Sequence, residues 1–133
     1  MIGNPKLKNQ RGFSLLELMI VMFIMIILIS VALPAYQGTI QHARETVLQD
    51  NLFQMRKLID QYTADKGKMP ASLEDLKKDN YLRDIPVDPI TNETKWDEIQ
   101  GEDPNKTDGG QGLKDIKSLA DGEDSNGKSY KEY

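Results

Sequence analysis

The apolar and polar residues divide the chain into three stretches. The first, from Leu18 to Ala35, is apolar apart from Ser30, and with residues 13–17 it reaches the roughly 20 residues that a membrane-spanning helix needs. One carboxylate, Glu17, lies near its start. An ionisable side chain in a membrane-length segment is costly and by default indicates a functional site. This stretch therefore predicts a transmembrane helix with a functional acid near one end.

The second stretch, residues 36–66, predicts an amphipathic continuation of that helix. Its apolar residues recur at three- and four-residue steps, and polar residues cover much of the rest. The apolar positions are Ile40, Ala43, Val47, Leu48, Leu52, Met55, Leu58, Ile59 and Tyr62, and the polar ones are Arg44, Glu45, Gln49, Asp50, Arg56 and Lys57. Gly67 followed by Pro70 is a stop signal. We therefore expect one helix from Phe13 to about Lys66, roughly 80 Å long.

The third stretch, residues 67–133, predicts a small head. Ser72 and Asp75 have the spacing of a capping box at the start of a short helix. Strands are expected at Thr94–Ile99, Leu113–Leu119 and Lys128–Tyr133, with an extended loop at 85–89 and a glycine-rich loop at 101–112. Few apolar residues follow Gly101, so the sheet must be small and rest on the helix. The predicted fold class is α+β, a long N-terminal helix with a small antiparallel-sheet head.

Composition and charge narrow the function. The chain has 133 residues and no cysteine, which excludes disulfides and thiol metal sites. Its net charge is −4, but residues 1–12 carry +3 from Lys6, Lys8 and Arg11, which leaves −7 for the remainder. A basic start before an apolar run predicts a cytoplasmic N-terminus and an exported head. The acidic head is a poor match for nucleic acid, because phosphate binding needs excess Lys and Arg.

Catalytic chemistry has little support in the sequence. Ser14 and Ser30 lie in the apolar segment, and the single histidine, His42, lies on the amphipathic stretch beside Arg44. No nucleophile has a base at a recognisable spacing, and no glycine-rich phosphate loop joins a strand to a helix. The sequence therefore predicts a protein that is not an enzyme.

The start of the chain allows three interpretations. An ordinary secretory signal would place a small-residue cleavage site after the apolar run, but residues 32–35 fit such a site poorly. The small residue Gly12 stands before the run instead, so cleavage there would remove the basic leader and keep the apolar helix. An uncleaved single-pass anchor is the third interpretation, and composition alone favours it.

The segment Gly12-Phe13-Ser14-Leu15-Leu16-Glu17 resembles the processing site of type IV pilins and type II secretion pseudopilins. The resemblance implies that a prepilin peptidase cuts after Gly12 and methylates the new N-terminal Phe13. It also implies that Glu17 neutralises the N-terminal amine of a neighbouring subunit during assembly. The alternative for Glu17 is an ordinary first-turn acid favoured by the helix dipole.

Pro34 fits the same resemblance. A proline inside a helix lacks the N–H and clashes with the preceding turn, so it should kink or loosen the helix near Ser30. The Ser30 hydroxyl could satisfy the freed backbone group. In the family, the matching proline lies where the helix bends or melts in the filament, which implies a packing role for Pro34 in assembly.

The head resembles the major pseudopilin of type II secretion. The features that it shares are Pro-x-Ser-Leu-x-x-Leu from Pro70, Tyr-Leu-x-x-Ile-Pro-x-Asp-Pro from Tyr81, and then Trp96. Type IV pilins usually carry a cysteine pair, which is missing here. The resemblance implies a leader at 1–12, a membrane and filament-core helix at 13–35, a stem at 36–66 and a head at 67–133.

The function that this resemblance implies is structural. The chain would polymerise with copies of itself into a periplasmic pseudopilus, anchored in the bacterial inner membrane with the head in the periplasm. Its other partners would be minor pseudopilins, the inner-membrane assembly platform and the prepilin peptidase. The alternatives are a type IV pilin for adhesion, motility or DNA uptake, and a plain membrane-anchored binding module.

A calcium site is the remaining candidate chemistry. Residues 118–127 hold three carboxylates in a short stretch, and hard oxygen donors suit Ca²⁺, although the spacing is not that of an EF-hand. Major pseudopilins bind calcium in this region, which implies side-chain ligands from Asp121 and Asp124 and backbone ligands from Ser118 and Leu119. The alternative is a solvated acidic turn.

Overall fold

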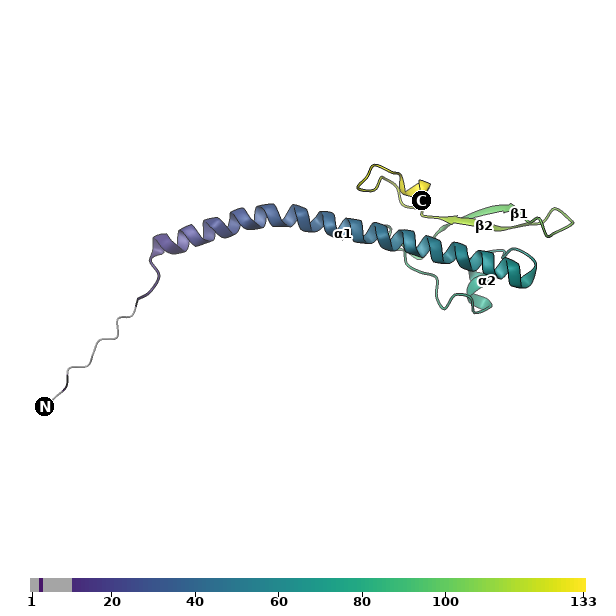
Figure 1. Cartoon of the computed structure of the whole chain (residues 1–133), viewed down its shortest axis with the longest axis horizontal. Coiled ribbons are helices and arrows are strands. Elements are labelled where there is room, and N and C mark those ends of the chain that lie inside the picture. Colours follow the sequence, from purple (N-terminus) through teal and green to yellow (C-terminus); the bar gives the residue numbers. More distant parts are fainter. Residues whose placement is uncertain (1–2, 4–10) are drawn as a thin grey trace. The chain divides into compact units, whose positions relative to one another are not determined.

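The computed structural model describes Gly3 and residues 11–133, and Figure 1 shows its elements. They are the helices α1 (Leu15–Lys66) and α2 (Leu73–Lys78), the strands β1 (Asp97–Glu102) and β2 (Gln111–Lys117), and the short 3₁₀ helix η1 (Tyr130–Glu132). The chain forms two compact units, Met1–Gln37 and Gly38–Tyr133. The α+β prediction is confirmed. Lys6 and Lys8 of the predicted leader lie outside the described residues.

In the first unit, α1 begins two residues later than predicted, because Ser14 caps it. The Ser14 hydroxyl accepts the Glu17 N–H at 3.1 Å, which satisfies one of the free donors of the first turn. The helix continues through Pro34, as expected. The Ser30 hydroxyl donates to the Ile27 carbonyl at 2.7 Å and not to the Ser30 carbonyl, which Pro34 leaves without its helical donor, so the expected role of this hydroxyl is wrong.

In the second unit, the core forms between the C-terminal half of α1 and the head. Five α1 residues at helical spacing supply one side of it: Leu48, Leu52, Met55, Ile59 and Tyr62. The other side comes from Leu73, Leu76, Trp96, Leu113, Ile116, Ala120, Tyr130 and Tyr133. The sheet does rest on the helix, as the scarcity of apolar residues after Gly101 predicted.

The sheet is a two-stranded antiparallel hairpin in which Asp97 pairs with Lys117 and Glu102 with Gln111. The pairing shifts by one residue between Ile99 and Gln100, the position of a bulge. Both strands exist near their predicted places, but β1 begins three residues late.

The predicted third strand at Lys128–Tyr133 is wrong. This segment forms η1, preceded by an isolated bridge between Glu123 and Ser129. The physical reason is that Tyr130 and Tyr133 are both buried and three residues apart. In a strand they would point to opposite faces, whereas a helical turn points both at the core.

The start of α2 is correct, but the predicted capping box is wrong. Ser72 occupies the N-cap position without a side-chain cap bond. Asp75 instead accepts the Ala71 N–H at 2.9 Å, and Glu98 of β1 accepts the Leu73 N–H at 2.6 Å. A carboxylate from the hairpin therefore does the capping that the local sequence assigned to Ser72.

Candidate functional site

The processing residues lie just before α1. Gly12 and Phe13 precede the first helical residue, and the Phe13 side chain is 86% exposed. Within residues 11–133, the Glu17 carboxylate makes no hydrogen bond or ion pair. It lines a depression of about 320 Å³ with Arg11, Gly12 and Phe13. This geometry leaves the Gly12–Phe13 bond accessible and the Glu17 carboxylate available for a partner outside the described chain.

The residues predicted to bind calcium have protein partners. Asp121 pairs with Lys131 at 2.7 Å, and this contact holds the pKa of the Asp121 carboxyl below its usual value. Asp124 accepts the Tyr133 hydroxyl at 2.6 Å and the N–H groups of Asn126 and Lys128. The tyrosine hydrogen bond is the main reason that the pKa of Asp124 is lowered. These two carboxylates therefore serve different partners.

The side chains of the two residues predicted to offer backbone ligands lie in different surroundings. The buried Ser118 hydroxyl donates to Asp88 and accepts the Ala120 N–H, and the Leu119 side chain is half exposed. Among residues 11–133, no three His, Cys, Asp or Glu side chains gather as metal ligands would. In this arrangement Lys131 pairs with one oxygen of Asp121, and chain donors occupy both oxygens of Asp124. Calcium binding to a rearranged segment stays a prediction.

Glu45 is the residue that the sequence interpretation missed. It was placed on the polar face, yet it is 4% exposed. Its carboxylate accepts the Ser125 N–H at 3.1 Å, the Ser125 hydroxyl at 2.7 Å and the Tyr130 hydroxyl at 3.1 Å. Burial opposes its ionisation, but the hydrogen bonds from Ser125, Tyr130 and Gln41 together keep the pKa of Glu45 below its usual value. The available signal was its position three residues before Leu48, in line with the buried face.

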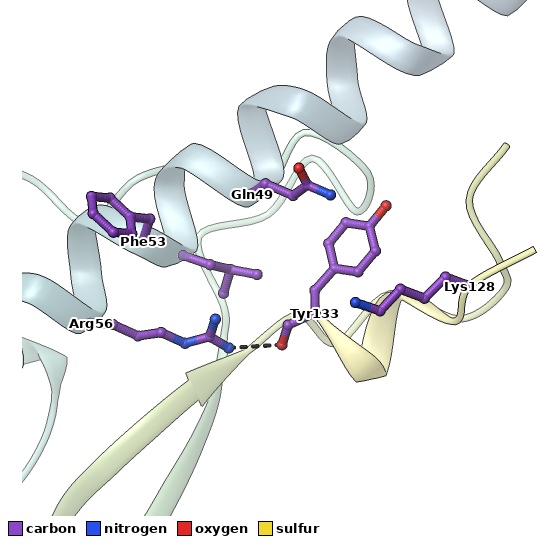
Figure 2. Close-up of a pocket in the computed structure, with 6 residues that line it drawn as sticks. Gln49, Phe53, Arg56, Lys128 and Tyr133 are labelled. Carbon is purple, nitrogen blue, oxygen red and sulfur yellow. Dashed lines mark hydrogen bonds between the residues drawn. The ribbon is translucent and has the colours of Figure 1, made fainter. Parts of the chain in front are cut away.

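A second contact zone lies beside the end of the chain. A cleft of about 370 Å³ is lined by Gln49, Leu52, Phe53, Arg56, Lys128 and Tyr133 (Figure 2). The Arg56 guanidinium donates to the Tyr133 carbonyl at 2.8 Å and to the Ile116 carbonyl at 2.9 Å, and its Nε lies 2.8 Å from Asp115. Lys128 lies over the Tyr133 ring, 5.3 Å from its centre. Arg56 thus connects α1 to β2 and to Tyr133, the residue that follows η1.

Comparison with known proteins places these features in a family. Residues 7–33 match the prokaryotic N-terminal methylation motif, which includes Gly12, Phe13 and Glu17. Competence protein ComGC of Halalkalibacterium halodurans is 31% identical to the chain, over 56% of this chain and 72% of the relative. The chain belongs to the type IV pilin-like proteins that carry this motif. Such proteins are structural, so this one is not an enzyme.

Two further relatives show how far the similarity extends. Type II secretion system core protein G of Klebsiella michiganensis is 29% identical over 98 residues, 62% of this chain and 69% of the relative. Fimbrial protein EcpC of Eikenella corrodens is 39% identical over 62 residues, 47% of this chain and 40% of the relative. No solved structure gives a significant match.

Membership in this family bears on where α1 lies in the cell. Among the described residues, α1 is the one helix with the length and apolar composition to cross a membrane, and none of its apolar window is buried. An N-terminal apolar helix with a methylation motif is typical of inner-membrane pilins. The family also implies processing by a prepilin peptidase and self-assembly into filaments.

Proposed function

We propose that this chain is a pseudopilin of a bacterial type II secretion system. It is anchored in the inner membrane, assembles into a periplasmic filament and helps to move folded proteins through a channel in the outer membrane. The observation that carries this proposal is the similarity to core protein G, which runs over 98 residues and so reaches far past the motif into the head. The absence of the cysteine pair that is usual in type IV pilins also supports it.

Maturation starts at the accessible bond between Gly12 and Phe13. Removal of residues 1–12 creates an α-amine on Phe13, which is positively charged at neutral pH. At the membrane this charge needs a partner, and Glu17 of a neighbouring copy provides a carboxylate with no competing contact in residues 11–133. Their attraction is strong in low dielectric, and desolvation offsets much of it. The pair therefore sets the register of neighbouring subunits more than it adds stability.

Assembly then covers the apolar half of α1. The large apolar side chains from Leu15 to Leu33 are 45–77% exposed, so lipid or other copies must cover them. Pro34 provides a place where the helix can bend while these side chains pack. The heads remain on the periplasmic side, where minor pseudopilins and the assembly platform act as further partners.

A type IV pilus that takes up DNA is the second candidate, because ComGC is a competence protein and its identity of 31% is slightly higher than that of core protein G. The two candidates differ in phenotype. Deletion of a secretion pseudopilin should keep exoproteins in the periplasm, whereas deletion of a competence pilin should abolish transformation and leave secretion intact.

Processing is tested by expressing the full chain in cells with and without a prepilin peptidase. Mass spectrometry of the membrane-extracted protein should show Phe13 at the N-terminus, methylated, only when the peptidase is active. Gly12→Val should block the cut, and Gly3→Val, which changes a glycine outside the site, should not. Electron microscopy should show filaments only with cleavage. An intact N-terminus and no filaments in cells with the peptidase would indicate a plain membrane-anchored module.

A further inference from the structure

We propose that residues 118–133, called here the C-terminal segment, are fastened to α1 by direct side-chain contacts centred on Glu45, and that this fastening needs no divalent cation. The inference concerns the second unit alone. It is independent of whether the chain forms filaments, so either idea can fail without the other.

Glu45 supplies the first contact. It is a buried carboxylate on α1, and three donors from the C-terminal segment converge on it: the N–H and hydroxyl of Ser125 and the hydroxyl of Tyr130. Gln41, one turn earlier, donates to the Tyr130 hydroxyl oxygen at 2.7 Å. A buried anion that receives several hydrogen bonds is a strong local anchor, and it is costly to leave without them. The hydrogen bonds from Ser125 and Tyr130 to the Glu45 carboxylate therefore hold the C-terminal segment against α1.

Asp124 braces the segment internally, and Arg56 supplies the second contact with α1. Asp124 closes a turn on the Asn126 and Lys128 N–H groups and accepts the Tyr133 hydroxyl, which fixes η1 to the loop before it. Arg56 then holds the far end of the segment through the Tyr133 carbonyl (Figure 2). Tyr130 and Tyr133 pack edge to face, with ring centres 5.7 Å apart, and both are buried.

These contacts perform the task that a metal ion would perform in such a loop. A bound cation would neutralise clustered carboxylates and tie the loop to the body of the head. Here Lys131 neutralises Asp121, hydrogen-bond donors satisfy Asp124, and Glu45 ties the loop to α1. Among the described residues, no buried side-chain oxygen or nitrogen lacks a partner, so no buried polar side chain of the segment needs a metal to satisfy it.

Hydrogen exchange on the full chain in detergent micelles tests the proposal. The readout is the exchange rate of residues 118–133, measured with chelator and with calcium at about 10 mM, which exceeds the roughly millimolar constants of weak extracellular sites. We expect the wild-type rates to agree in the two conditions. Glu45→Gln keeps the size of the side chain but places an amide against the Ser125 and Tyr130 donors, so exchange should accelerate about tenfold or more in chelator. Asp50→Asn, an exposed change on the same helix, should leave the rates unchanged.

Two outcomes would overturn the proposal. One is protection of the wild-type segment that appears, or rises about tenfold, only with calcium, which would show that a cation holds it. The other is a Glu45→Gln variant as protected as the wild type, which would show that the carboxylate is not the anchor. If Glu45→Gln does not fold, Ser125→Ala decides instead: it removes one donor, and unchanged exchange in that variant would equally overturn the proposal.

Discussion

The two halves of α1 carry one informative carboxylate each, and the two are held in opposite ways. Glu17 lies among apolar side chains that are at least 45% exposed, and within residues 11–133 its carboxylate has no partner. Glu45 is 4% exposed and receives hydrogen bonds from residues of the C-terminal segment. The comparison teaches that, of two carboxylates on one helix, one is satisfied by its own chain, while the other is left for a partner elsewhere, the role that we propose for Glu17.

The apolar residues of the two halves of α1 differ in the same way as the two carboxylates. From Leu15 to Leu33 the large apolar side chains are at least 45% exposed and need lipid or another subunit to cover them. From Leu48 to Tyr62 one face of the helix is closed by the head. Stability of the second unit is therefore a property of the single chain, whereas that of the first depends on its surroundings.

The largest expected effect separates the two carboxylates. Glu17→Ala should abolish filaments in cells with an active prepilin peptidase, because the Phe13 amine of a neighbour loses its partner, while cleavage and head stability stay as in the wild type. Glu45→Gln should instead destabilise the head and leave the Glu17 carboxylate available for its partner. Electron microscopy and thermal melting of each variant measure both properties. Filaments of normal yield from Glu17→Ala would contradict the pairing.

The second prediction breaks the core of the head. Leu52 is 1% exposed, and Leu52→Ala should lower the free energy of unfolding by about 2–5 kcal/mol through lost burial and a cavity. The neighbouring residue offers a matched control, because Phe53 is 63% exposed and Phe53→Ala should cost less than about 1 kcal/mol. Denaturant unfolding followed by the fluorescence of Trp96 measures both. Equal losses would mean that Phe53 contributes as much to the stability of the head as Leu52 does, which would contradict this reading of the core.

The third prediction concerns acid. Hydrogen bonds hold the pKa values of Glu45 and Asp124 below their ordinary values, so between the folded and unfolded pKa values the unfolded chain binds more protons. The groups that face them are His42, 4.0 Å from Glu45, the Tyr130 and Tyr133 hydroxyls, and Lys128.

Their stabilisation is complete above the unfolded values near pH 4 and is lost as the pH falls through the folded values. The melting temperature of the head should therefore be flat from pH 7 to about pH 5 and fall below that. Glu45→Gln should show a shallower fall, and Asp50→Asn the wild-type profile. A melting temperature that stays constant down to pH 2 would contradict this reading.

The smallest expected effect is at Arg56. Arg56→Lys keeps the charge but loses the fork that reaches Asp115, Ile116 and Tyr133, and it should cost about 1 kcal/mol, since the side chain is partly exposed. Lys57→Ala on the exposed face is the control. Calorimetry on the two variants resolves the difference, and an effect at Lys57 as large as that at Arg56 would rule out a specific role for the guanidinium.

Local patterns in the sequence were enough to predict the long helix, the apolar face from Leu48 to Tyr62 and the two strands of the hairpin. The processing motif likewise needs only consecutive residues. What the sequence could not reveal depends on contacts between distant residues. Glu98 caps a helix 25 residues earlier, and Glu45 becomes buried only because Ser125 and Tyr130 fold onto it. Such contacts override local preferences for a strand or a polar surface.

The separation along the chain between Glu45 and its partners also sets an order of events. Ser125 and Tyr130 follow Glu45 by 80 and 85 residues, so synthesis delivers the helix long before the residues that cover its carboxylate. Contacts this far apart form slowly, because a long loop must close before they add any stability. Until then, the head holds an uncovered anion and an open core. The fold can therefore be completed only after the C-terminal segment has been synthesised. A head truncated before Ser125 would expose the Glu45 carboxylate and the open core on α1, which quality-control proteases could recognise.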